Sequence, residues 1–290
     1  MKIDFVFDPA LIRGISEQFL TPTHLERKHK YARTKLMIAT TENNSNQPLA
    51  SLREIQELAI AITAKSLNPA MLTVDFLKYS GIVPPDWELN AQPVLNPNYA
   101  QVNFQNGISI VAQPRKITFV EIIKSPASLN LKLPEIVGLY LDKLPLAEYQ
   151  ALNIAPKSIV PLPSSPDAAK KYITETLLAP GPWHNFGTAP LQAGINLFYQ
   201  LETSQLSVAI NEAKLQLPDG KILGALLFAG NFNYNLAEGR DRLNLLKQYL
   251  GQWRKDLEIF RELITQRFLE RQVPVFPSNI NLPLGHQGGL

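Results

Sequence analysis

The feature that most constrains the fold of this chain is the alternation of large apolar residues and amides between residues 189 and 236. In segment 222–236, Phe228 and Phe232 share one parity, and Asn231 and Asn233 share the other. Successive side chains of a strand point to opposite faces. This segment therefore predicts a strand with one apolar face and one face that ends in amides.

Two further strands are predicted just before it, at 189–201 and 206–216, and a Pro-Asp-Gly turn at 218–220 joins the second to the third. In the first of them, Ile195 and Leu197 oppose a set of amides. The apolar parity should lie beneath helices, because a shift of one residue would exchange the two faces. The amides of this strand are Gln192, Asn196 and Gln200.

A long helix is predicted at 238–271, with Asn235 as its N-cap and Glu238 as the capping-box partner. At 1.5 Å per residue this helix would span about 50 Å. Apolar residues recur along it at spacings of three and four, which form one helix face. This stripe either packs on the sheet or forms the coiled-coil seam of a homodimer. It consists of Leu246, Leu250, Trp253, Leu257, Phe260 and Ile264.

The first half of the chain gives a similar order of elements. A strand is predicted at 2–7. Ser51 and Glu54 form a capping box before a helix whose stripe contains Ile55, Leu58 and Ile62. A second helix is predicted at 68–81, and three strands follow at 99–104, 108–113 and 116–123, with an Asn-Gly hairpin turn at 106–107. A helix at 134–144 ends this half. Amides on the polar parity of these strands are Gln101, Asn103 and Gln113.

The second half restarts with a strand at 154–162 and a helix at 165–178, before the strands and helix already described. Both halves then read as strand, one or two helices, three strands and helix. We therefore expect an α+β fold of two pseudo-repeated halves that form one curved antiparallel sheet with helices on one face. The halves are 1–149, with an insertion at 9–50, and 150–272, and an extended tail follows at 273–290.

This order is similar to the pseudo-symmetric saddle of TATA-binding-protein-like and helix-grip architectures. The strands that lead into a long helix with Phe-Arg-Glu-Leu-Ile at 260–264 also resemble a sporadically distributed bacterial family of uncharacterised function. The resemblance implies a fold and carries no functional residue across, because function belongs to sites rather than to folds.

Composition and motifs exclude several classes of function. The chain has no cysteine, which excludes disulfides and thiolate metal sites. Its net charge of +3 is too balanced to indicate nucleic-acid binding by itself. No Walker, G-x-G-x-x-G or G-x-S-x-G motif occurs. We expect no catalytic residue, cofactor or metal, a cytoplasmic location and no membrane span, and an enzyme of unrecognised class remains the alternative.

The amide-rich sheet face is the predicted binding site of a non-catalytic protein, whose partner is most simply another protein, because an amide both donates and accepts hydrogen bonds. Its residues are Gln101, Asn103, Gln113, Gln192, Asn196, Gln200, Asn231 and Asn233. The alternative partner is nucleic acid, bound by a basic segment in which Tyr31 could stack on a base. That segment contains Arg27, Lys28, Lys30, Arg33 and Lys35. Trp183 and His184 form a third candidate, a ligand site on a loop.

Overall fold

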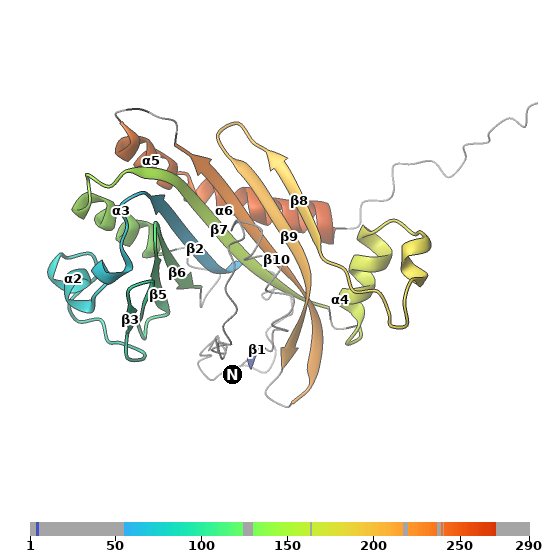
Figure 1. The fold of residues 1–290 in the computed structure, drawn as a ribbon. Coiled ribbons are helices and arrows are strands. Elements are labelled where there is room, and N and C mark those ends of the chain that lie inside the picture. The colour runs from blue at the N-terminus through green and yellow to red at the C-terminus, as the bar shows by residue number, and fades with distance from the viewer. Residues whose placement is uncertain are drawn as a thin grey trace, which may run out of the picture.

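One antiparallel sheet of ten strands organises the protein, an α+β molecule whose strand order is β1-β9-β10-β7-β2-β6-β5-β4-β3, with β8 paired to β9 (Figure 1). This computed structural model describes residues 4–5, 55–123, 130–162, 164–216, 220–236, 239 and 241–270. The strands are β1 (Asp4–Phe5), β2 (Ile55–Ala64), β3 (Val94–Asn96), β4 (Tyr99–Asn103), β5 (Ile108–Gln113), β6 (Lys116–Ile122), β7 (Tyr149–Leu162), β8 (Ile195–Gln200), β9 (Gln205–Gln216) and β10 (Ile222–Asn235).

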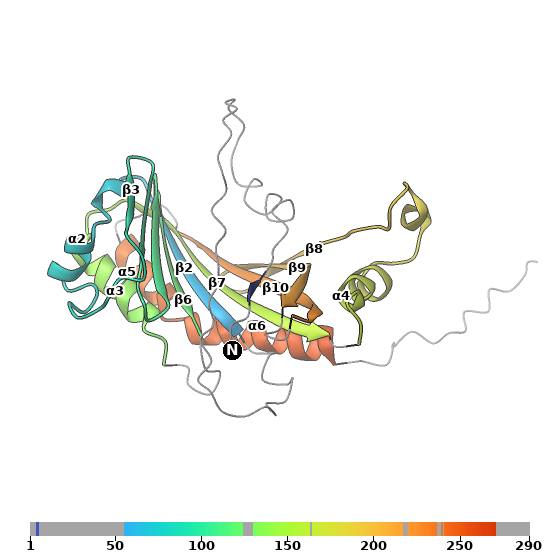
Figure 2. The same cartoon turned by 90° about the horizontal axis from the view of Figure 1, so that it is seen from below.

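Helices cover one face of this sheet, and the sheet curves away from them (Figure 2). They are α2 (Val74–Tyr79), α3 (Leu133–Lys143), α4 (Ala168–Lys171), α5 (Arg242–Leu250) and α6 (Trp253–Glu262), with 3-10 turns η3 (Pro69–Met71) and η5 (Pro182–Asn185) and π-helices η4 (Tyr172–Leu177) and η6 (Leu263–Leu269). α5 and α6 lie against the convex face. We call the opposite face, which turns away from α5 and α6, the concave face (Figure 2).

The strand parities follow the sequence pattern. Phe228 and Phe232 are fully buried, and a Cβ at Gly230 would lie 2.7 Å from the ring of Phe260 on α6. This parity of β10 therefore faces the helix, and Asn231 and Asn233 point to the concave face. The apolar stripe from Leu246 to Ile264 is buried as well. It packs on the sheet, so a dimer through this helix would have to use its other side.

The prediction of a helix after Ser51 is wrong, because residues 55–64 form the central strand β2. Leu58, Ile60 and Ile62 are all fully buried, a strict alternation that is typical of a strand. The helical stripe matched some of the same residues by chance, and pairing with β6 and β7 on both sides outweighs the local capping signal. The strand predicted at 2–7 contributes Asp4–Phe5, which pairs with β9.

Two predicted boundaries also move. The helix at 238–271 is three segments. α5 ends at Leu250, just before Gly251, the residue type least favourable to helices after proline, and α6 continues directly into η6. The N-cap of α5 is Asp241 and not Asn235, which is the last residue of β10. The strand predicted at 189–201 begins only after Gly194, so Gln192 lies on the irregular segment before β8 and outside the sheet.

The strand order places β2 and β7 side by side at the centre of the sheet. β6, β5 and β4 continue outward from β2, while β10, β9 and β8 continue outward from β7. The insertion at 9–50, the basic segment within it and the tail at 273–290 lie outside the described residues. No helix in the described part of the chain is both long and apolar enough to cross a membrane.

Candidate binding surface on the concave face

Four amide side chains form one row across four strands of the concave face. Gln200 on β8 lies opposite Gln205 on β9, which lies opposite Asn233 on β10. Asn233 in turn lies opposite Asn153 on β7, and the Asn153 Nδ2 donates a hydrogen bond to the Asn233 Oδ1 at 3.2 Å. Residues directly opposite each other in antiparallel strands share a face, and neighbouring strands are about 4.8 Å apart. We call these four residues the amide row.

The amide row becomes more accessible toward the edge of the sheet. Gln200 and Gln205 are exposed, whereas Asn233 and Asn153 are half-buried. Beside the row, Asn231 is half-buried, and its side chain makes no hydrogen bond within the described residues. An amide group with unused donors and acceptors can pair with a polar partner that approaches the row.

Small side chains continue the row toward the middle of the sheet. Asn153 lies opposite Ala61, and Ala61 lies opposite Thr118 on β6. In a parallel row, Ala229 lies opposite Lys157, whose Nζ contacts the Glu57 Oε1 at 2.5 Å. The short side chains of Ala61 and Ala229 project little above the sheet, beside the longer side chains of Lys157 and Glu57.

The amides predicted on the first half lie in a separate group. On β4 the Tyr99 hydroxyl donates to Gln101 at 2.6 Å, the Gln101 Nε2 donates to Asn103 at 3.0 Å, and the Ser109 hydroxyl donates to Asn103 at 2.6 Å. Four inter-strand steps separate β4 from β7, on the order of 19 Å along the sheet. The predicted amide face is therefore two groups with a floor of small residues between them. Gln113 is an isolated exposed amide at the end of β5.

The other end of the concave face is closed. A small apolar cluster of Ile159, Ala213, Leu215 and Ala225 is buried there, although its members have the same parity as the amides. The exposed amides Gln200 and Gln205 lie at the opposite end of this face from the apolar cluster.

Sequence reasoning missed two members of the amide row, Asn153 and Gln205. Each lies just outside a predicted strand, because β7 begins at Tyr149 and β9 begins at Gln205. Extending the same alternation by a few residues would have found both, and strand boundaries are the least reliable part of such predictions.

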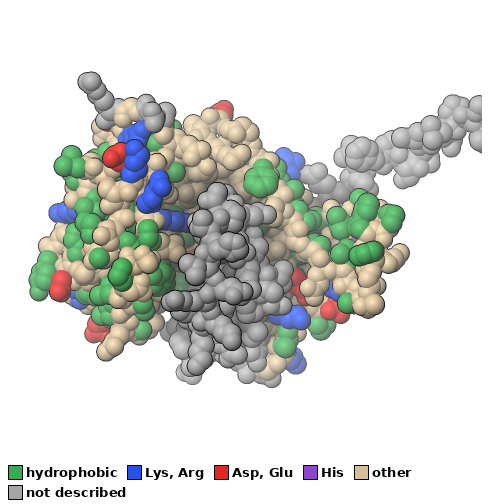
Figure 3. Space-filling view, viewed as in Figure 1, with side chains coloured by type: hydrophobic (Ala, Val, Ile, Leu, Met, Phe, Trp, Pro, Cys, Tyr) green, Lys and Arg blue, Asp and Glu red, His purple; other side chains and the backbone are tan. Residues whose placement is uncertain are grey.

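Contacts within the chain itself hold the loop that carries the third candidate site. The Nε2 of His184 lies 3.0 Å from the Thr174 carbonyl, and its Nδ1 lies 3.3 Å from the Gly181 N–H. The Nε2 contact thus fastens the loop to η4, and the Nδ1 contact closes the turn of η5 on Gly181. Trp183 is half-exposed and Phe186 is 88% exposed, on the side of the molecule that bears α4, where hydrophobic side chains gather (Figure 3).

Ionisable groups elsewhere have structural roles in this arrangement. The Glu121 carboxylate accepts hydrogen bonds from the Leu133 and Lys132 N–H groups at the start of α3, and burial raises the pKa of Glu121. Glu212 lies on β9, with β2, β7 and β10 between it and β6, so the two carboxylates do not meet. Within the described ranges, no three His, Asp or Glu side chains could together hold a metal ion.

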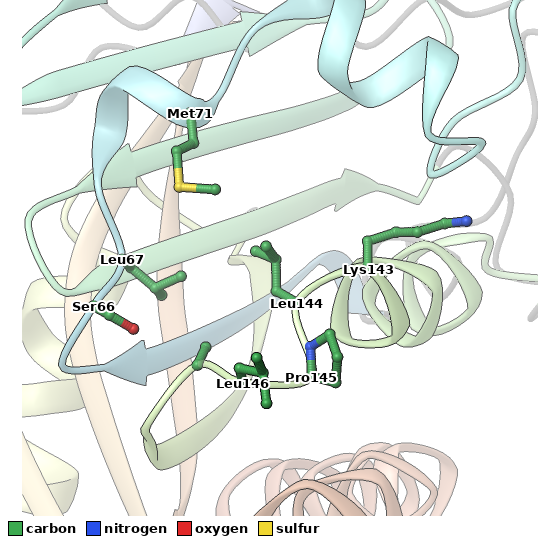
Figure 4. A pocket seen from close by; sticks show the side chains of 8 residues that line it. Ser66, Leu67, Met71, Lys143, Leu144, Pro145 and Leu146 are labelled. Carbon is green, nitrogen blue, oxygen red and sulfur yellow. The ribbon is translucent and has the colours of Figure 1, made fainter.

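A hollow of about 320 Å³ lies between the start of η3 and the end of α3 (Figure 4). Its lining is mostly apolar, with Met71, Leu144 and Leu146 among the contributors. The Lys143 side chain points away from them (Figure 4). This lining offers no group of facing ionisable side chains for acid–base chemistry.

The fold and the surface define an α+β protein with one curved antiparallel sheet, helices on its convex face and amides on its concave face. A comparison with protein-family models finds no match for the sequence, and a search of curated proteins finds none either.

Proposed function

We propose that this chain is a non-catalytic binding protein that recognises a protein partner through the amide row. The observation that carries the proposal is the register of Gln200, Gln205, Asn233 and Asn153 across four neighbouring strands. The row is continued by Ala61, whose short side chain projects little above the sheet.

The chemistry of amides supports a peptide ligand. Each amide presents two donors and an acceptor, which match the N–H and C=O groups of an extended backbone. Neutral amides cannot act as a general base near neutral pH. The Glu57–Lys157 pair is the nearest charged feature, and a peptide that carries a charge could compete with it.

The test is a selection of random peptides displayed on phage against the immobilised full-length chain. Peptides that emerge should bind the wild-type protein and bind an Asn153→Ala/Asn233→Ala variant at least about tenfold more weakly, because each interfacial hydrogen bond contributes about 1 kcal/mol. The double change removes both partners of the Asn153–Asn233 hydrogen bond, and Asn235, which also accepts from Asn233, is exposed and can bond to water instead.

Gln113→Ala is the matched control, because it removes an exposed amide of β5 far from the row. It should leave peptide affinity unchanged. The proposal fails if no peptide is enriched, or if enriched peptides bind the double variant as well as the wild type.

Nucleic acid remains the competing partner, through the basic segment with Arg27, Lys30 and Arg33. Fluorescence polarisation with single- and double-stranded DNA and RNA separates the two proposals. Nucleic-acid binding must weaken steeply as salt rises, because it releases counterions. Salt-sensitive binding by the wild type that persists in the double variant would favour this alternative over the peptide.

We also propose that the two halves of the sheet are an internal duplication with a TATA-binding-protein-like arrangement. The support is the strand order, in which β6-β5-β4 on one side of the β2–β7 pair corresponds to β10-β9-β8 on the other. A duplication of this kind would make the amide row and the polar group on β4 related parts of the two halves.

A further inference from the structure

β8 is an edge strand whose outer backbone groups have no neighbouring strand among the described residues. The Leu201 N–H donates to the Ser204 carbonyl at 2.9 Å, which makes these two residues a hydrogen-bonded pair of the hairpin. Hydrogen-bonded pairs alternate along an antiparallel ladder. Leu197 and Tyr199 therefore bond to β9, and the backbone N–H and C=O groups of Asn196, Phe198 and Gln200 point outward.

This edge lacks the features that usually block pairing with another chain. β8 has the sequence Ile-Asn-Leu-Phe-Tyr-Gln, with no charge, proline or glycine. Phe198 is 65% exposed on it. The opposite edge differs, because β3 has only three residues and lies between Pro93 and Pro97. Natural edge strands are commonly protected by charges, prolines or short length, and a long unprotected edge is a pairing site.

We propose that β8 pairs antiparallel with the β8 of a second copy of this chain, about a two-fold axis that passes beside Phe198. In this register Phe198 lies opposite the partner's Phe198, and Asn196 lies opposite the partner's Gln200. On the other face, Leu197 lies opposite the partner's Tyr199. The outward backbone groups of Asn196, Phe198 and Gln200 form the inter-chain hydrogen bonds.

A second copy fits this edge because the strand is self-complementary. A two-fold axis places each residue of the strand opposite the same residue of the copy, or opposite one close to it in sequence. A strand that carried a charge near the axis would therefore repel its own copy. β8 carries no charge, and its alternation pairs aromatic with aromatic and amide with amide. The dimer would also add one amide of the partner to each amide row, since Gln200 ends the row at this edge and would lie opposite the partner's Asn196.

The first test is the mass of the full-length chain by sedimentation velocity. We expect a species of twice 32.4 kDa for the wild type at about 100 µM and dissociation on dilution. Phe198→Lys and Phe198→Glu should each be monomeric, because like charges would face each other at the axis. An equimolar mixture of the two should recover the dimer, because opposite charges then meet.

Leu95→Lys is the matched control, since it places the same charge on the half-exposed β3 edge and should leave the dimer intact. A monomeric wild type overturns the proposal and leaves β8 as an edge for a different partner. A dimer that survives Phe198→Lys, or a mixture that stays monomeric, overturns this register.

A second test does not depend on charge. The chain contains no cysteine, so Phe198→Cys introduces a single thiol. In the proposed register the two thiols face each other across a hydrogen-bonded pair with Cα atoms about 5.5 Å apart, a spacing that a disulfide can bridge. Mild oxidation should give a covalent dimer from Phe198→Cys and none from Leu95→Cys. The reverse pattern, or equal yields, contradicts the proposal, and neither test depends on peptide binding.

Discussion

Asp256 is a carboxylate buried beneath the sheet, and it differs in this from the other charged side chains of the described residues. Asp256 on α6 is 2% exposed, and both of its oxygens accept hydrogen bonds from the Tyr234 hydroxyl, at 2.9 and 2.8 Å. The ring of Tyr234 stacks on that of Tyr249 with centroids 4.8 Å apart. Burial raises the pKa of Asp256 to about 6, and the hydrogen bond from Tyr234 only partly offsets this.

The raised pKa makes the stability of the fold depend on pH. Between its ordinary value of 3.8 and about 6, Asp256 binds more proton in the folded chain than in the unfolded chain. Its contribution to the free energy of unfolding is therefore full below pH 4 and is lost as the pH rises through 6, by about 3 kcal/mol in all. Asp256→Asn should remove this dependence, as urea unfolding at pH 4.5 and 7.5 would reveal.

The comparison between the wild type and Asp256→Asn isolates the effect of Asp256 on the free energy of unfolding. Other carboxylates titrate equally in wild type and variant, so the difference between their unfolding free energies reports Asp256 alone. We expect that difference to shift in favour of Asp256→Asn by on the order of 2 kcal/mol from pH 4.5 to 7.5. An unchanged difference would mean that the buried carboxylate keeps an ordinary pKa.

At the scale of elements, the sequence predicted most strands correctly, because their alternation is strict. The parity of β10 follows from Phe228 and Phe232, which are buried as expected. β2 was misread because Ile55, Leu58 and Ile62 satisfy a helical period, whereas Leu58, Ile60 and Ile62 satisfy a strand period. Pairing with β6 and β7 decides that this segment is a strand and not a helix. That pairing involves segments distant in the sequence.

The packing of β10 on α6 gives a prediction for a pair of residues. A Cβ at Gly230 would lie 2.7 Å from two carbons of the Phe260 ring and 3.2 Å from Pro156. Gly230→Ala should therefore destabilise the protein by about 1–3 kcal/mol in urea unfolding. The same change should cost less in a Phe260→Leu background, where the smaller side chain can yield, and a double-mutant cycle measures that coupling.

Gly138 on α3 is the matched control for this experiment. A Cβ there meets no atom within 4 Å, so Gly138→Ala should be neutral or should stabilise α3 by up to about 1 kcal/mol. Equal costs at Gly138 and Gly230, or an additive cycle with Phe260→Leu, would show that β10 and α6 do not pack as closely as described.

At the scale of the whole molecule, the sheet joins the two halves of the chain through its two central strands. β2 and β7 align over nine residue pairs. Their register shifts by one residue at Gln56, and the Gln56 side chain stabilises this irregularity. Its Nε2 donates to the Ile159 carbonyl at 3.1 Å, and its Oε1 accepts from the Ile159 N–H at 2.7 Å. The position of the amide row depends on this arrangement, because Asn153 comes from β7 and neighbours Ala61 of β2.

The site could be predicted only as far as strand parity reaches. Parity placed Asn231, Asn233 and Gln200 on the concave side, but it carries no information on which strands are neighbours. The sequence therefore grouped Gln101 and Asn103 with them, although four inter-strand steps separate β4 from β7. Long-range pairing between β2 and β7, which sets that separation, leaves no local signal in the sequence.

A split of the chain tests whether the sheet is one cooperative unit. Leu146, which is 92% exposed, lies between α3 and β7 and is a suitable break point. Fragments 1–146 and 147–290 should each remain largely unfolded alone, because each exposes a hydrophobic central strand as a new edge. When co-expressed, they should co-purify as a one-to-one complex that unfolds in a single transition.

Ile60→Asp in the first fragment should abolish this association, because Ile60 is fully buried on β2 and an unpaired buried charge is costly. Leu95→Asp, on the half-exposed edge strand β3, should leave it intact. Cooperative unfolding of either fragment by itself, followed by circular dichroism in urea, would contradict a single unit and indicate two independently stable domains that dock through β2 and β7.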